Sequence, residues 1–163
     1  MKIYKKKDLA FSILPYGAAG GTFLSLAAMD RFRLNEKCKL AGTNFRRASL
    51  TRASLRESDL SGADFRGATL DGAQIELCDA RGAIFNRISA KKCAILKTDL
   101  GGADLYGCNL FLSSLRKSRL TGANLGRANL YGVDFFKCVV GDTNFEGANL
   151  KRTHLASRTD LLR

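Results

Sequence analysis

The chain of 163 residues carries an unbroken five-residue repeat over 38–155, and this period constrains the fold more than any other feature. Every residue whose number is a multiple of five, from Leu40 to Leu155, is apolar, which makes twenty-four positions. The residue two places earlier is usually small, as at Ala53 and Ser58. An amphipathic helix needs apolar residues at i, i+3, i+4 and i+7, and a half-buried strand needs strict alternation. A step of five fits neither, so the chain must turn a corner once per unit. The pattern predicts a solenoid.

A second period of twenty sets the number of units in each coil. Glycine recurs at Gly42, Gly62, Gly82, Gly102 and Gly122, and central phenylalanines stand at Phe45, Phe65, Phe85 and Phe145. Three units per coil would scatter these rows, whereas four units align them. Twenty-four units then make six coils of square cross-section, stacked at ~4.8 Å. We expect the central phenylalanines 45, 65 and 85 to stack directly, and the recurrent glycine to mark a corner with positive φ.

Several units match one known pattern, A(D/N)LXX. The clearest are 63–67, 103–107, 123–127, 128–132 and 148–152. On these residues the chain resembles the pentapeptide-repeat family over about three quarters of its length. The resemblance implies an all-β solenoid, a right-handed quadrilateral β-helix of about six coils, with no cofactor and usually no catalytic site. Members that are understood act by surface contact, among them gyrase-binding quinolone-resistance proteins whose acidic columns imitate DNA, and some secreted bacterial effectors.

The net charge of +12 bears on the partner. One interpretation is an acidic partner, which would be an acidic protein, a nucleic acid or an anionic membrane surface. The other is a solvated exterior whose charge only keeps the column soluble, and both stay open. A DNA mimic needs concentrated negative charge, and only Asp59, Asp79 and Asp99, with Asp64 and Asp104 on a neighbouring face, form such a strip. The sequence therefore disfavours gyrase mimicry, which remains the narrowest alternative.

The cysteines share one structural position. Cys38, Cys78, Cys93, Cys108 and Cys138 all occupy the small inward place in their units. A cysteine there behaves as a small hydrophobe, no two lie twenty residues apart as a bridge between coils requires, and no zinc spacing occurs. We expect reduced, inward thiols in a cytoplasmic protein. The single histidine, His154, lies at an outward position without a partner nucleophile, so the sequence predicts no catalytic, cofactor or metal site and no enzyme.

Residues 1–37 differ in kind from the repeats. A lysine cluster precedes an uncharged stretch at 9–29, which suits a membrane anchor, although a proline and three glycines interrupt it. The alternative is a cap on the open end of the column. A five-residue step runs out of register here and would need one inserted residue between Leu34 and Leu40. A short helix over 22–32, N-capped by its threonine, is a second form of the cap.

Large side chains at outward positions indicate where a partner binds. The candidate residues are Tyr106, Phe111, Leu112, Tyr131 and Phe136, with Arg116, Lys117 and Lys137 nearby. Aromatic and basic side chains resemble the composition of binding hot spots. Stacking that only stabilises neighbouring coils is the competing interpretation. Phe111 and Tyr131 are twenty residues apart, so we expect their rings to stack.

The organisation predicted from the sequence has three parts. A capping or membrane-associating segment spans 1–37, the pentapeptide β-helix spans 38–157, and a tail spans 158–163. The predicted function is a non-catalytic scaffold that binds a protein partner, which the basic charge suggests is acidic. The alternative is a protein held on a membrane by 9–29. Many relatives form dimers through their carboxyl end, so the resemblance also implies a homodimer.

Overall fold

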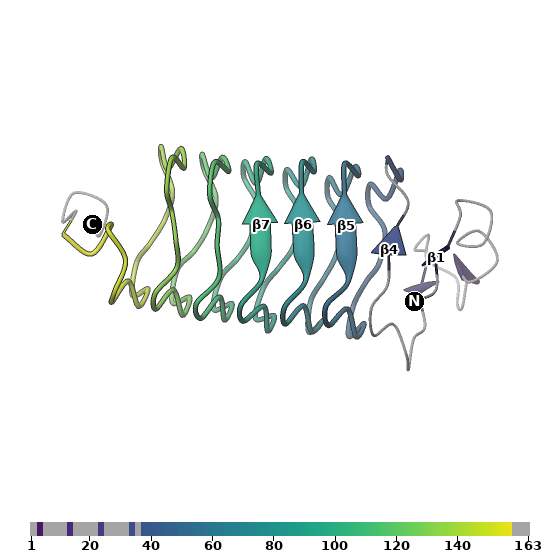
Figure 1. Ribbon diagram of the computed structural model, residues 1–163, viewed down its shortest axis with the longest axis horizontal. Coiled ribbons are helices and arrows are strands. Elements are labelled where there is room, and N and C mark those ends of the chain that lie inside the picture. Colours follow the sequence, from purple (N-terminus) through teal and green to yellow (C-terminus); the bar gives the residue numbers. More distant parts are fainter. Residues whose placement is uncertain (1–2, 5–12, 15–22, 25–32, 35–36, 158–163) are drawn as a thin grey trace.

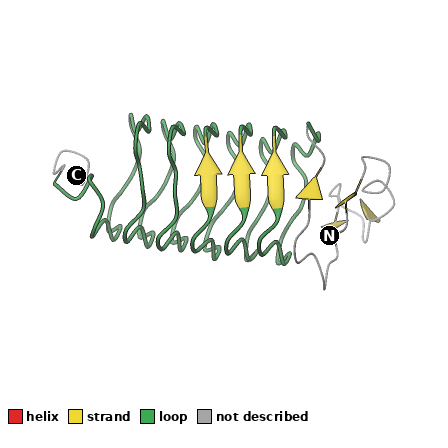
Figure 2. Ribbon diagram, in the orientation of Figure 1, coloured by secondary structure: helices red, strands yellow, loops and turns green. Residues whose placement is uncertain are grey.

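A computed structural model describes residues 3–4, 13–14, 23–24, 33–34 and 37–157. The chain winds into coils that stack along the long axis, in sequence order from β5 through β7 to the last described coil (Figure 1). The strands are β1 (Ile3–Tyr4), β2 (Ile13–Leu14), β3 (Phe23–Leu24), β4 (Arg33–Leu34), β5 (Ser54–Arg56), β6 (Gln74–Glu76) and β7 (Ala94–Leu96). The fold is the predicted right-handed quadrilateral β-helix. Each side of the square coil is so short that most of it forms turns and isolated β-bridges. Figure 2 therefore shows most of the column as loop.

The stacking register confirms four units per coil. Leu55 pairs with Ile75 and Ile75 pairs with Ile95, so strands β5, β6 and β7 are parallel and twenty residues apart. Single parallel bridges carry the same register onward, ending with the pair of Asn129 and Asn149. Each residue therefore lies above the residue twenty places earlier, and a row of side chains can be read directly from the sequence.

The core confirms the prediction of inward central residues. All twenty-four central side chains are buried except Val140, which is partly buried and packs against the others. The rings of Phe45 and Phe65 stack with centroids 4.6 Å apart and planes 7° from parallel. Phe65 and Phe85 continue the stack at 4.7 Å and 10°. The coil spacing thus falls within the range of distances at which aromatic rings stack.

Positive φ occurs at every corner, whereas the sequence predicted it only at the glycine corner. The twenty-three units with central residues 40–150 each place a left-handed residue two positions after the central one, ten of them glycine and thirteen not, and Lys37 just before the first unit has the same conformation. At most of these corners the chain makes a hydrogen-bonded β-turn. For example, the N–H of Ala63 donates to the carbonyl of Leu60 at 3.0 Å, with Gly62 at φ 62°. The non-glycine corners are Lys, Arg, Glu, Leu or Asp, and none of these described corners carries a β-branched residue.

Asparagine and aspartate residues stabilise these turns. Every Asn or Asp directly before a central residue accepts a hydrogen bond from the backbone N–H two residues later, in all twelve units that have one. Asp59, Asp79 and Asp99 belong to this set, with N···O distances of 2.9–3.1 Å. Amide side chains also bond between coils, as from Asn129 to Asn109 at 3.1 Å. The acidic strip is therefore part of the turn structure.

The amino-terminal strands extend the sheet by two further parallel pairings, β4 with β5 and β1 with β4. Strand β4 lies parallel to β5, and Arg33 pairs with Ser54, twenty-one residues later. This offset confirms the single inserted residue. Phe23 and Leu24 form β3, which pairs antiparallel with β2. The predicted helix over 22–32 is therefore wrong at these two positions. The remaining residues of 1–36, with most of 9–29, and 158–163 lie outside the described residues. No helix in the described part could cross a membrane.

Candidate binding surface

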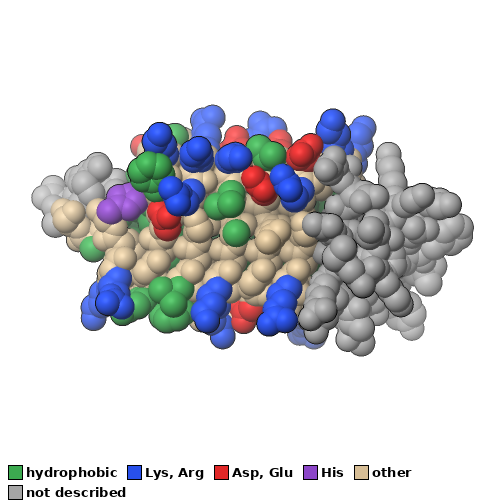
Figure 3. All heavy atoms as spheres, in the orientation of Figure 1, with side chains coloured by type: hydrophobic (Ala, Val, Ile, Leu, Met, Phe, Trp, Pro, Cys, Tyr) green, Lys and Arg blue, Asp and Glu red, His purple; other side chains and the backbone are tan. Residues whose placement is uncertain are grey.

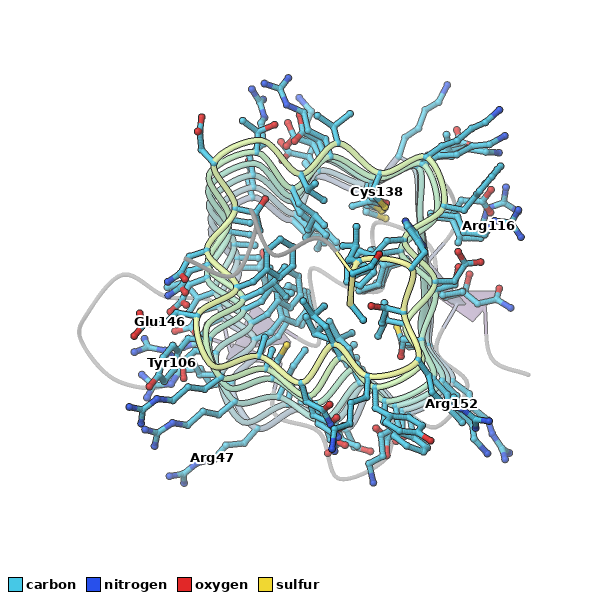
Figure 4. The ribbon with its side chains drawn as sticks, turned by 90° about the vertical axis from the view of Figure 1, so that its left-hand side faces the viewer. Arg47, Tyr106, Arg116, Cys138, Glu146 and Arg152 are labelled. Carbon is cyan, nitrogen blue, oxygen red and sulfur yellow. The ribbon has the colours of Figure 1, made fainter. Side chains whose placement is uncertain are left out.

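Seven of the eight candidate residues lie on two adjacent corners of the column. Phe111, Leu112 and Tyr131 form what we call the aromatic corner. The next corner along the chain, here the basic corner, carries Arg116, Lys117, Phe136 and Lys137. One flat side of the square separates the two corners. In the view down the axis, Arg152 marks the row of the aromatic corner and Arg116 the row of the basic corner (Figure 4).

The aromatic corner is built from two stacked rings and a leucine. The rings of Phe111 and Tyr131 lie 5.4 Å apart and 14° from parallel, which confirms the predicted stack. The Arg152 guanidinium lies 5.9 Å from the Tyr131 ring centroid. Leu112 leans over Gly132, where a Cβ atom would come within 2.6 Å of its Cδ2. Both rings are half-buried, but Leu112 stays 46% exposed. The ring stack stabilises the column, and Leu112 is the apolar group that remains available.

The basic corner surrounds one exposed ring with cations. Phe136 is 45% exposed, with the Arg116 guanidinium 4.9 Å and the Lys137 ammonium 5.3 Å from its ring centroid. Arg116 also forms an ion pair with Asp134 at 3.5 Å. Lys117 lies one coil before Lys137 in the same row, so their backbones are about 4.8 Å apart along the axis of the column. Figure 3 shows Lys and Arg side chains gathered along the edges of the column, with flatter sides between them.

Tyr106 does not belong to this surface. Figure 4 places it on the opposite side of the column, near Glu146 and far from Arg116. Its ring lies over Gly126, where a Cβ atom would be 3.2 Å from the ring. The structure therefore separates Tyr106 from the other candidates. The period of twenty already contained this information, because 106, 126 and 146 fall in one row. Sequence reasoning also missed Arg152, whose place above Tyr131 follows from the same period.

Two carboxylates of the acidic faces are paired with arginine. Arg81 binds Asp79 at 2.6 Å, and Arg66 binds Asp64 at 2.6 Å. The hydrogen bond from each arginine side chain lowers the pKa of its aspartate below the ordinary value. Paired carboxylates present little net negative charge to a partner, so these faces do not offer the continuous acidic surface that mimicry of DNA requires.

The thiols have the environment of core residues. Cys38, Cys78, Cys93 and Cys108 are buried and Cys138 is partly buried. Cys78, Cys93, Cys108 and Cys138 form no disulfide. Desolvation raises the pKa of Cys93 and Cys108 to about 12, and it also raises the pKa of Cys78 and Cys138. Nucleophilic chemistry requires the thiolate, so these thiols are inert at neutral pH.

The raised thiol pKa values predict a loss of stability at alkaline pH. Between pH 9 and 12 the unfolded chain releases protons that folded Cys93 and Cys108 retain, so the free energy of unfolding falls as pH rises. At pH 10 the two thiols together account for a loss of about 2–3 kcal/mol. Urea unfolding at pH 7.5 and pH 10 measures this loss. The double variant Cys93→Ala/Cys108→Ala should show a smaller decline, and an equal decline would contradict the assignment.

The described residues contain one histidine and no cluster of metal-ligating side chains. No group of three His, Cys, Asp or Glu side chains there could hold a metal ion. His154 is exposed, and its ring lies 6.4 Å from that of Phe135 in an edge-on arrangement. What the surface offers is apolar area beside fixed positive charge, which suits recognition of another molecule.

Solved structures with the same architecture show what this chain resembles. The fluoroquinolone-resistance protein QnrB1, described as plasmid-mediated, superimposes with a TM-score of 0.67 at 23% identity, over 78% of this chain and 62% of that chain. A pentapeptide-repeat protein of the Arabidopsis thaliana thylakoid lumen gives a TM-score of 0.58 at 29% identity, over 62% of this chain and 70% of that one. The chain thus spans less than two thirds of the QnrB1 chain. Comparison with curated protein sequences gives no significant match.

Sequence profiles of two related families match the repeats. The profile described as a pentapeptide repeat region matches 33–105. The profile described as pentapeptide repeats in eight copies matches 92–125 and 113–152. Together they cover 33–152, the span in which the structure shows the coils. Proteins of this kind are generally structural or binding scaffolds. By its repeat, its coil geometry and these matches, the chain belongs to the pentapeptide-repeat family.

Proposed function

We propose that this protein is a non-catalytic binding scaffold in the cytoplasm, whose protein partner docks on the side between the aromatic and basic corners. The observation that carries the proposal is the exposure of Leu112 and Phe136, which are each about half open to solvent and are the two of the four exposed large hydrophobics in the described residues that flank this side. Isolated exposed hydrophobics are common, but two large ones beside a stacked aromatic pair mark an interaction site.

Charge supports the same surface. Arg116, Lys117 and Lys137 border the apolar groups, and only Arg116 of these is in an ion pair within the described residues. Lysines at the rim of an interface accelerate the encounter with an acidic partner, while the apolar centre supplies most of the affinity. An acidic protein surface therefore fits this side best. The arginine-paired aspartates favour this proposal over a gyrase-binding mimic of DNA.

The double variant Leu112→Ser/Phe136→Ser tests the proposal, because these two exposed side chains carry it. Affinity capture from the native host identifies the partner, and titration then compares dissociation constants. If these two side chains are anchors, the affinity should fall by more than about 1 kcal/mol per residue, which is about fivefold each. Tyr106→Ser is the matched control, because it removes an aromatic ring from the opposite side and should leave the affinity unchanged.

A second measurement separates binding from stability. The rings of Phe111 and Tyr131 stack on each other, so the variant Phe111→Ser/Tyr131→Ser loses a contact between coils, and a lower melting temperature with unchanged affinity would mean that the rings serve only the column. If Leu112→Ser/Phe136→Ser keeps full affinity for the partner, the proposed surface is wrong. Salt should weaken binding of the unaltered protein, because part of the attraction is between exposed charges.

A further inference from the structure

A hollow opens in the aromatic-corner row, but nearer the amino terminus. The corner residues of this row begin with Arg52, Gly72 and Lys92, one per coil. A cavity of about 320 Å³ lies there. Its lining is Thr51, Arg52, Asp71, Gly72, Lys91 and Lys92. We call it the corner notch.

Glycine at the middle coil makes the notch. The backbones of Arg52 and Lys92 are two coils apart, which is about 9.6 Å. Gly72 lies between them and carries no side chain, so a gap one coil high remains between their long side chains. The stem of Arg52 enters this gap, since its Cγ lies 3.4 Å from the place that a Cβ of Gly72 would take. Two cationic side chains therefore border one small space.

The charges in the notch do not cancel. The carboxylate of Asp71 is held by other partners. Its Oδ1 accepts hydrogen bonds from the Ser89 hydroxyl at 2.7 Å and from the backbone N–H of Lys91 at 2.9 Å. Its Oδ2 lies 3.6 Å from the Lys91 ammonium, which balances its charge. Neither Arg52 nor Lys92 forms an ion pair with any described residue. Arg52, Lys91 and Lys92 together with Asp71 give the lining of the notch a net charge of +2.

We propose that the corner notch binds a phosphate monoester group. Such a group carries a charge of about −1.5 to −2 at neutral pH, which matches the two unbalanced cations. Arg52 can donate two parallel hydrogen bonds to phosphate oxygens, Lys92 supplies a point charge, and the Thr51 hydroxyl can donate a further bond. A single carboxylate would leave one cation unbalanced. The volume lies at the lower end of the range for small-molecule pockets, so it admits a phosphate and a small part of its carrier.

Calorimetric titration of the full chain with inorganic phosphate tests this site. We expect saturable binding that Arg52→Gln and Lys92→Gln each weaken about tenfold or more, because each removes a charged hydrogen-bond donor. Arg47→Gln is the matched control. Arg47 lies in the same coil at the equivalent corner position, and its Cγ lies 3.5 Å from the Cβ position of Gly67, but it does not line the notch. This control should bind phosphate as the unaltered protein does.

Three outcomes would overturn the assignment. These are the absence of saturable phosphate binding, an equal loss of affinity in Arg52→Gln and Arg47→Gln, and acetate binding as tightly as phosphate. Thermal unfolding of each variant checks that the coils remain intact. We expect unchanged melting temperatures, because neither arginine is in the core. A phosphoserine peptide that binds more tightly than inorganic phosphate would identify a phosphorylated protein as the source of the group. Equal affinities would identify a small phosphate ester.

Discussion

Replacing Phe65 by alanine should lower the free energy of unfolding by ~3–5 kcal/mol. Phe65 is fully buried and is the middle ring of the stack, with neighbours at 4.6 and 4.7 Å. Its removal leaves a cavity that the coils above and below cannot close, because the hydrogen bonds between backbones fix their spacing. Both stacking contacts are lost as well. Urea unfolding followed by circular dichroism measures the loss.

Phe65→Leu is the matched control for this prediction. Leucine already occupies the same row at Leu105 and Leu125, where both side chains are fully buried. The row therefore accepts either residue, and the control should cost only about 1 kcal/mol. A loss for Phe65→Ala as small as that for Phe65→Leu would mean that the stacked rings do not hold these coils together.

The sequence was sufficient to predict the coils because each unit obeys the same local rule. A large inward residue every five positions and aligned rows every twenty determine the cross-section and the stacking. The pairing of Phe45 with Phe65 and of Phe111 with Tyr131 follows by counting. The inserted residue before Leu40 follows in the same way, since Arg33 pairs with Ser54. Where contacts lie directly between neighbouring coils, sequence periodicity is a reliable guide.

Other features depend on how a long side chain bends, and periodicity does not specify that. The positive φ of Arg47 and Arg52 was not predicted, because glycine is the usual signal for such a backbone. The stems of these arginines lie against the glycine of the next coil, which only the coordinates show. The corner notch arises from this bend. The sequence shows a glycine between two cationic residues at Arg52, Gly72 and Lys92. The row of Arg47, Gly67 and Arg87 has the same pattern and does not line the notch, so the pattern alone could not have located it.

Deletion of one whole coil, residues 78–97, should leave a folded and shorter column. Thr98 would take the place of Cys78, and every later residue would keep its row. A solenoid is stabilised by its repeats and by the contacts of each repeat with its neighbours, so losing one coil removes one share of the stability. We expect cooperative urea unfolding with a smaller slope against denaturant, because less surface is exposed on unfolding. Strand β6 would then pair with the segment around Leu115.

Deletion of Gly101 alone should be far more damaging than deletion of twenty residues. Each later residue would move one place, so that Asp104 would enter the buried position of Ala103 and Leu105 would turn outward. With the five-residue steps kept, seven of the ten inward positions from 103 to 148 would receive a carboxylate or an amide and one an arginine. Burying these groups costs several kcal/mol per coil, more than the total stability of a small domain. Limited proteolysis should then digest the chain beyond residue 101 and spare the earlier coils. If the single deletion folds as well as the twenty-residue deletion, the register is not what holds the column together.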